Sequence, residues 1–434
     1  MRRNPPSIPP FLKGGSTSFA ALTVLVFAAC STPVPPAATA TPVEVGLERF
    51  AADGAAADGA ADLRGKRLGL VVHAASVTAE GRHAIDVVRG LGLDVARLFS
   101  PEHGLRGRSA AGEAVAGGRD EVSGLEVVSL YGEHKKPQLA DLEGLDALVF
   151  DLQGAGVRFY TYVSTLILCL EAAAEAGIEF VVLDRPNPLG GERVEGPVAA
   201  TREVVAASFV NLAPGPLVHG LTLGEMARHV NAGLPQPARL TVVAMSGWRR
   251  DMTWADTGRP WVPPSPNLRS AEAALAYPGV ALLEATNVSE GRGTETPFLL
   301  FGATWLRSER LAEAVRGRTP GFELSPARFI PRASLAAPRP KYLDRECAAL
   351  AVWVADRAAA EPYRLGVELL AALAREPGFE FLRGGEALTW LAGTPRLYRD
   401  LSEGRTVEKI LAADAADHAA WRAARRPALL YPER

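Results

Sequence analysis

A carboxylate and an imidazole stand side by side in the stretch FSPEHG, directly after the apolar run DVARLF. These residues are Glu102 and His103, and such a pair can donate and accept protons as a general acid and base. Cleavage of a glycosidic bond needs a proton donor and usually a second carboxylate that acts as nucleophile or base. We therefore predict that Glu102 is a catalytic acid/base and that His103 assists it.

Polar side chains also follow three other apolar runs. His73 follows RLGLVV, Asp151 follows DALVF, and the run EFVVL is followed by Asp184, Arg185 and Asn187. In an open parallel sheet, ligands bind beyond the carboxyl ends of the strands. We predict that these runs are strands of one sheet and that the five residues bind substrate beside the FSPEHG turn.

A later loop carries Asn287, Glu290 and Arg292 after the run ALLEA, which we expect to be a strand. We expect this loop to close the site from a second domain. Glu290 is then the predicted second catalytic carboxylate, with Asp151 and Asp184 as alternatives.

The segment GVRFYTYVSTL adds Arg158, Tyr160 and Tyr162 after the run that ends at Asp151. Sugar rings pack on aromatic faces, and the fork of an arginine binds a carboxylate through two hydrogen bonds. We predict that these three side chains contact a sugar, with Arg158 suited to a carboxylate substituent.

Each of these residues also has a structural alternative. Glu102 can complement the dipole of a helix N-terminus, and the two aspartates can pair with a nearby arginine or cap the next helix. His73 can be a hydrogen-bonded histidine at a strand end, and Glu290 can belong to a tight glycine-rich turn.

Several other functions lack their sequence signatures. The chain has no GxSxG, HExxH or Walker A motif and no GxGxxG after the first apolar run, which disfavours serine esterases, zincins and nucleotide enzymes. Its three cysteines lack the spacing of a zinc site or a disulfide framework. With a formal net charge of −2, nucleic acid is not an expected partner.

Short apolar runs alternate with helical patterns from Lys66 onward, which is typical of a parallel sheet in an α/β protein. We predict a Rossmann-like, doubly wound catalytic domain over residues 62–272. Residues 255–269 are too rich in proline for a helix or a sheet and are expected to form either an ordered, rigid loop or an interdomain crossing, in a position to line a cleft. Residues 273–434 are predicted to form a smaller α+β domain that completes the cleft, with helices over 308–317, 363–376 and 407–426.

The first 30 residues resemble a lipoprotein signal peptide. Basic residues precede a short apolar run over residues 19–29, and the run ends in FAAC. Acylation of Cys30 would tether the chain to a membrane, although an ordinary signal peptide with an incidental cysteine is the alternative. Residues 31–61 are rich in Ala, Pro, Thr and Gly, and we predict a disordered tether there. The expected location is outside the cytoplasm, facing the periplasm or cell wall.

Longer strings resemble the NamZ-type exo-β-N-acetylmuramidase family in order and spacing. They include FSPEHGLRG, GLDALVFDLQGAGVRFYTYVSTL, LDRPNPLGG, WVPPSPNL and YPGVALLEATNVSEGRGTETPF. The resemblance implies a Rossmann-like domain and a smaller C-terminal domain with the active site between them. It also implies removal of terminal β-1,4-linked N-acetylmuramic acid from the non-reducing end of peptidoglycan fragments, with neither metal nor organic cofactor.

The same resemblance implies roles for individual residues. The glutamate of the family's PEHG motif is Glu102, the general acid/base, with His103 adjacent. Residues implied in binding the sugar and its lactyl carboxylate are Arg158, Tyr160, Asp184, Asn187, Asn267, Asn287, Glu290 and Arg292. Two alternatives are a muropeptide-binding lipoprotein without activity and a hydrolase that acts on another amino sugar or on an ester.

Overall fold

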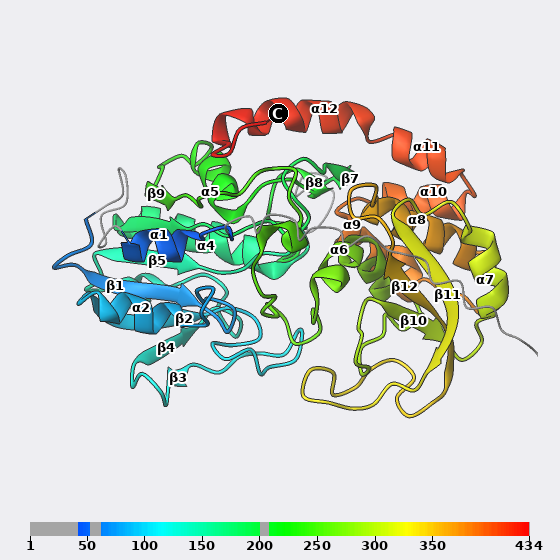
Figure 1. Cartoon of the computed structure of the whole chain (residues 1–434), viewed down its shortest axis with the longest axis horizontal. Coiled ribbons are helices and arrows are strands. Elements are labelled where there is room, and N and C mark those ends of the chain that lie inside the picture. Colours follow the sequence, from blue (N-terminus) through cyan, green and yellow to red (C-terminus); the bar gives the residue numbers. More distant parts are fainter. Residues whose placement is uncertain (1–41, 53–61, 200–207, 434) are drawn as a thin grey trace, which may run out of the picture. The chain divides into compact units, whose positions relative to one another are not determined.

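A seven-stranded sheet forms the centre of the N-terminal half in the computed structural model, which describes residues 42–52, 62–199 and 208–433 (Figure 1). Its strands are β1 (Arg67–Val72), β2 (Asp94–Ser100), β3 (Gly118–Arg119), β4 (Glu126–Ser129), β5 (Ala147–Asp151), β6 (Glu179–Leu183) and β9 (Arg239–Val243). Their order is β3-β4-β2-β1-β5-β6-β9, and every pair is parallel except β3 with β4. Counted along the chain, the parallel strands lie in the order 3-2-1-4-5-6, which is that of a Rossmann-type sheet. The predicted doubly wound fold is confirmed.

Helices cover both faces of this sheet because alternate strand residues point to opposite sides. Val149 and Val181 pack on the face that α1 (Gly46–Ala52) and α2 (Ala84–Gly90) cover. Phe150 and Phe180 pack on the opposite face with the helices α4 (Thr161–Ala176) and α5 (Leu223–Asn231). The strands are therefore buried on both sides, which explains their nearly continuous apolar sequences.

The tether predicted over residues 31–61 was wrong for residues 42–52. These residues include α1, whose Leu47 and Phe50 are buried against the sheet. A side chain at Gly46 would clash with the backbone, since an added Cβ would lie 2.4 Å from the amide nitrogen of Asp184. The sequence VEVGLERF thus docks a short amphipathic helix. Residues 31–41 and 53–61 lie outside the described residues, as do the signal peptide and Cys30.

The C-terminal half is α+β, as predicted. Its antiparallel sheet has the order β10-β12-β11, formed by β10 (Leu300–Ala303), β11 (Phe322–Phe329) and β12 (Cys347–Val354). The three predicted helical regions are confirmed by α7 (Ser308–Val315), α8 (Pro362–Leu373), α11 (Val407–Ala412) and α12 (Ala415–Arg425). The remaining described α-helices are α3 (Leu139–Leu142), α6 (Ala271–Val280), α9 (Glu386–Ala392) and α10 (Arg396–Ser402). None of the helices in the described ranges is long and apolar enough to cross a membrane.

The strand expected at ALLEA was wrong. Residues Ala281–Ala285 form a 3-10 turn that continues directly from α6. Ala281, Leu282, Leu283 and Ala285 are all buried, and Glu284 is the one polar residue of the segment. A continuous apolar run has no periodicity that separates a buried helix from a buried strand.

The two halves share one hydrophobic core and form a single compact unit from residue 41 onward. The C-terminal segment returns to the N-terminal half, where Trp421 Nε1 donates a hydrogen bond to the carbonyl oxygen of His219 at 2.8 Å. The hydroxyl of Tyr431 donates to Asp184 at 2.7 Å. The small hairpin of β7 (Glu195–Val198) and β8 (Pro216–Val218) lies beside α12. These contacts join the C-terminal segment to the N-terminal half.

Candidate active site

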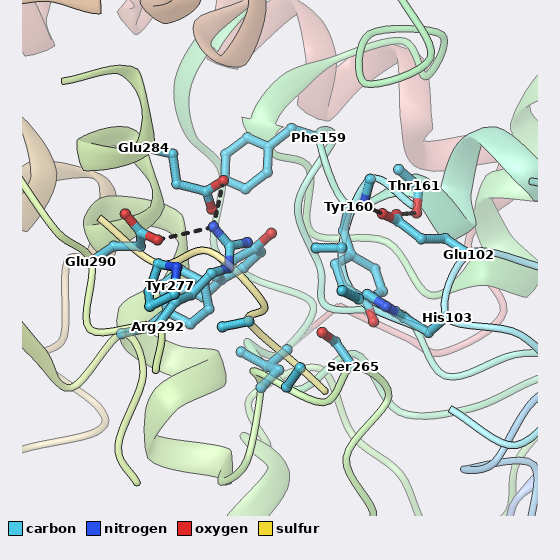
Figure 2. A pocket seen from close by; sticks show the side chains of 18 of the residues that line it. Glu102, His103, Phe159, Tyr160, Thr161, Ser265, Tyr277, Glu284, Glu290 and Arg292 are labelled. Atoms are coloured by element: carbon cyan, nitrogen blue, oxygen red, sulfur yellow. Dashed lines mark hydrogen bonds and ion pairs between the residues drawn. The ribbon is translucent and has the colours of Figure 1, made fainter. Parts of the chain in front are cut away.

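A cavity of about 440 Å³ lies beyond the carboxyl ends of β2, β4 and β5, where the two halves of the chain meet. The proline-rich loop lines it through Ser265 and Leu268, as predicted for residues 255–269. The charged and aromatic lining residues are Glu102, His103, Tyr131, Phe159, Tyr160, Tyr277, Glu284, Glu290, Arg292, Phe298, Arg339 and Lys341. Figure 2 shows Glu102 and His103 on one wall, facing Glu284, Glu290 and Arg292.

Glu102 is held at the N-terminus of α4. Its Oε1 accepts a hydrogen bond from the backbone N–H of Gly112 at 2.7 Å, and its Oε2 accepts one from Thr161 Oγ1 at 2.6 Å. Thr161 is the first residue of α4, so the carboxylate also lies near the positive end of the helix dipole. The side chain is only 7% exposed, yet it lines the cavity. Glu102 therefore complements the dipole of α4, as in the structural alternative, and at the same time lines the cavity, as the catalytic prediction requires.

His103 follows in a strained turn. Its φ of 70° lies in the left-handed region, which residues other than glycine seldom adopt. Nδ1 lies 3.0 Å from the carbonyl oxygen of Ser109, and because a carbonyl can only accept, Nδ1 carries the proton. Burial lowers the pKa of His103, against the opposing charge of Glu102. At neutral pH the imidazole is therefore uncharged, with Nε2 as an acceptor.

The hydroxyl of Tyr162 supports the backbone of Glu102 from behind. It lies 3.1 Å from the carbonyl oxygen of Glu102 and 2.9 Å from that of Pro264. Tyr162 is buried and does not belong to the cavity lining, so the prediction that it contacts the sugar was wrong. It links the turn that carries Glu102 to the proline-rich loop.

Replacing Tyr162 with phenylalanine is expected to lower kcat about tenfold with little change in KM, because the catalytic turn loses a positioning hydrogen bond. The free energy of unfolding should fall by about 1 kcal/mol. Steady-state kinetics and urea unfolding measure the two effects. Tyr398→Phe is the matched control, since Tyr398 stands outside the lining. An unchanged kcat in the Tyr162 variant would refute the positioning role.

The opposite wall carries an ion-pair network. Arg292 Nη1 lies 2.9 Å from Glu284 Oε2 and 3.1 Å from Glu290 Oε1. Lys341 Nζ lies 3.2 Å from Glu290 Oε2 and also donates to the carbonyl oxygens of Leu283, Glu284 and Val288. Burial raises the pKa of Glu290, but Lys341 and Arg292 outweigh it and lower the pKa. Glu290 is therefore an ionised carboxylate across the cavity from Glu102.

Aromatic rings fill the floor between the two walls. Tyr277 lies 4.7 Å from Phe298 and 5.3 Å from Phe159, measured between ring centroids, and Tyr160 stacks edge-on against Tyr277 at 6.2 Å. All four residues line the cavity. Such a surface suits the apolar face of a sugar ring.

Five of the predicted site residues line the cavity. They are Glu102, His103, Tyr160, Glu290 and Arg292. The others lie outside the lining and are held by contacts within the protein.

The predicted ligands at the ends of β5 and β6 contact the protein instead of the cavity. Arg185 binds both carboxylate oxygens of Asp151, with 2.8 Å between Nη2 and Oδ2. Asp184 accepts hydrogen bonds from Thr222, Gly224 and Tyr431. Burial raises the pKa of Asp184 to about 6. The structural alternative weighed for the two aspartates is therefore the one observed.

Arg158 was predicted to bind a carboxylate, and this was wrong. Its guanidinium donates to the carbonyl oxygens of Pro197, Gly215 and Ala392 and to the side chain of Asn211, at 2.5–3.1 Å. The residue is 0% exposed. Arg158 joins the N-terminal half to the end of α9.

The amide and imidazole side chains among the predictions are also occupied. Asn187 accepts a hydrogen bond from the backbone N–H of Leu189 in its own turn and donates one to the carbonyl oxygen of Leu221. Asn287 is bonded to Gly378 and Glu380, and Asn267 donates to the carbonyl oxygen of Ala336.

His73 Nε2 accepts a hydrogen bond from the backbone N–H of Gln153 at 3.0 Å. Burial lowers its pKa well below the ordinary value. It is the hydrogen-bonded strand-end histidine of the structural alternative.

The lining residues that the sequence predictions missed include Tyr131, Phe159, Thr161, Tyr277, Glu284, Phe298, Arg339 and Lys341. Thr161 stood inside a string already singled out, between Tyr160 and Tyr162, and its place at the start of α4 could have identified it. Lys341 comes from a loop about 50 residues after Glu290, and no local pattern connects the two.

Within the described ranges, no three His, Cys, Asp or Glu side chains are grouped so that they could hold a metal ion.

Comparisons with known proteins agree with this architecture. Residues 68–272 match the family model described as exo-beta-N-acetylmuramidase NamZ, N-terminal, and residues 275–431 match its C-terminal counterpart. The peptidoglycan beta-N-acetylmuramidase NamZ of Bacillus subtilis (strain 168) is 40% identical over 353 residues, which are 80% of this chain and 83% of that protein.

Two crystal structures of DUF1343 family proteins from Bacteroides fragilis NCTC 9343 are also similar. One has a TM-score of 0.78 at 29% identity and covers 90% of this chain and 99% of its own. The other has a TM-score of 0.71 at 27% identity, with 91% and 100% covered. The chain therefore belongs to the exo-β-N-acetylmuramidase NamZ family of glycosidases.

Proposed function

We propose that this protein removes terminal β-1,4-linked N-acetylmuramic acid from the non-reducing end of peptidoglycan fragments. The observation that carries the proposal is the placement of Glu102 in a cavity that also holds an ionised carboxylate and an aromatic floor. The Bacillus subtilis relative is named a peptidoglycan beta-N-acetylmuramidase, which supports the proposal.

In the proposed reaction Glu102 acts first as a general acid. Protonated Glu102 gives its proton to the glycosidic oxygen as the bond to the muramic sugar breaks. If configuration is retained, the resulting carboxylate takes a proton from the water that completes the hydrolysis. If configuration is inverted, Glu290 takes that proton and Glu102 is reprotonated from solvent. Hydrogen bonds from Gly112 and Thr161 stabilise the Glu102 carboxylate. The neutral Nε2 of His103 accepts a hydrogen bond from a sugar hydroxyl.

Glu290 is the second carboxylate of the proposal. Its negative charge stabilises the positively charged transition state, and it acts either as nucleophile or as base for the attacking water. The anomer released first separates these two roles. A β-anomer seen by proton NMR means retention and excludes Glu290 as the base for direct attack by water, and an α-anomer means that Glu290 activates water.

A tetrasaccharide of alternating sugars with N-acetylmuramic acid at its non-reducing end tests the exo mode. The proposal expects free N-acetylmuramic acid and a trisaccharide as the first products, and mass spectrometry of samples taken over time detects them. Disaccharides as first products would indicate an endo-acting enzyme instead. Binding without any product would favour the muropeptide-binding alternative. Preferential cleavage of the chromogenic glycoside of another amino sugar, or of an ester, would favour the alternative of a hydrolase with a different substrate.

We also propose that the chain is exported and tethered to a membrane by acylation of Cys30. The basic residues, apolar run and FAAC sequence support this. Cells fed an alkyne fatty acid should label the wild type in the membrane fraction, whereas Cys30→Ser should be unlabelled. Labelling that persists in Cys30→Ser, or a wild-type protein that stays in the cytoplasm, would contradict the proposal.

A further inference from the structure

The charges that line the cavity are almost all neutralised by one another. Arg292 and Lys341 pair with Glu284 and Glu290, and Glu102 is the remaining carboxyl group of the lining. The remaining cation is Arg339. In the described part of the chain, its guanidinium has no hydrogen-bond or ion-pair partner, and the side chain is exposed at the cavity.

The loop that carries Arg339 is fixed on both sides. Before it, the carbonyl oxygen of Ala336 accepts a hydrogen bond from Asn267 Nδ2 at 2.8 Å. After it, Lys341 is anchored to Glu290 and to three carbonyl oxygens of the opposite wall. Pro338 and Pro340 flank the arginine and restrict its backbone. The loop thus presents a free guanidinium from a rigid support, which lowers the entropy lost on binding an anion.

We propose that Arg339 binds the carboxylate of the lactyl ether, the group that distinguishes N-acetylmuramic acid from N-acetylglucosamine. Arginine binds a carboxylate through two parallel hydrogen bonds. Lys341 and the Nη1 of Arg292 already contact glutamates, so the charges of both cations are balanced, although the Nε of Arg292 has no hydrogen-bond partner among the described residues. Arg339 therefore takes the role that the sequence analysis gave to Arg158 and Arg292. This inference rests on the proposed function, since it assigns the specificity of the same site.

Two chromogenic substrates that differ only in the lactyl group test the assignment, the β-glycosides of N-acetylmuramic acid and of N-acetylglucosamine. Arg339→Gln is expected to lower kcat/KM for the muramic glycoside about 10- to 100-fold, with the value for the other glycoside unchanged. Arg339→Lys keeps the positive charge but cannot form the two parallel hydrogen bonds, so its kcat/KM for the muramic glycoside should lie between those of the wild type and Arg339→Gln. Arg332→Gln is the control, because Arg332 is an exposed arginine of the same loop that pairs with Asp344 outside the lining.

An equal loss on both substrates, or no loss on either, would overturn the assignment. If the wild type cleaves the muramic glycoside, such a result contradicts only the role of Arg339 and leaves the proposed function intact. If the wild type cleaves neither glycoside, the proposed function fails, and calorimetric binding of the two free sugars decides the role of Arg339. A wild-type preference for N-acetylmuramic acid that disappears in Arg339→Gln supports the assignment, and equal binding of the two sugars by the wild type contradicts it.

Discussion

Replacing Glu102 with glutamine is expected to lower kcat on a muramic glycoside by about 100- to 10,000-fold, the range typical for the loss of a general acid. The fold should be retained, because the amide matches the carboxyl in shape and can still bond to the N–H of Gly112 and to the hydroxyl of Thr161. The amide carries no proton that it can transfer to the leaving oxygen. Steady-state kinetics measures the loss, and circular dichroism measures the fold.

Glu113→Gln is the matched control for this substitution. Glu113 follows Glu102 by eleven residues and is exposed outside the cavity lining, so its replacement should leave kcat unchanged. If Glu102→Gln keeps the wild-type rate, Glu102 is not the acid. If both variants lose activity together with their fold, the loss reports on stability and the acid lies elsewhere.

The second large effect is expected from Arg158→Met, which should lower the free energy of unfolding by about 3–5 kcal/mol. The substitution leaves buried carbonyl oxygens of Pro197, Gly215 and Ala392 without their donor. Each unsatisfied buried group costs about 1–3 kcal/mol, partly relieved by local rearrangement. Denaturant unfolding measures the change.

Arg316→Met removes an exposed arginine that pairs with Glu313 and should change stability by less than about 1 kcal/mol. The KM of the Arg158→Met variant shows whether Arg158 has a structural role or binds substrate. A structural role leaves the KM of the folded fraction near the wild-type value. A variant of normal stability with a raised KM would show that Arg158 binds substrate after all.

The sequence predicted the Rossmann-like sheet well because its strands are covered on both faces. Their continuous apolar runs, separated by helical patterns, leave few other arrangements. Two local errors have the opposite cause. Residues 42–52 are ordered because a short helix docks on the sheet, a contact with residues far along the chain. Ala281–Ala285 has only Glu284 as a polar residue, so its sequence does not separate a helix from a strand.

The site was harder to predict than the fold. Polar residues at strand ends look alike in sequence whether they face a ligand or each other, and Asp151 with Arg185 is a pair of the second kind. Glu102 and Glu290 were placed in the cavity correctly, whereas their roles stay predictions. Lys341 and Arg339 could not be found from local patterns, because a loop far along the chain brings them to the site.

The most direct test is an assay of the disaccharide in which N-acetylmuramic acid is β-1,4-linked to N-acetylglucosamine, with wild type and Glu102→Gln side by side. We expect the wild type to release both free sugars in equal amounts and the folded variant to release almost none over the same time. Absence of product with the wild type, or equal rates for the two proteins, would contradict the central claim that Glu102 serves a muramidase site.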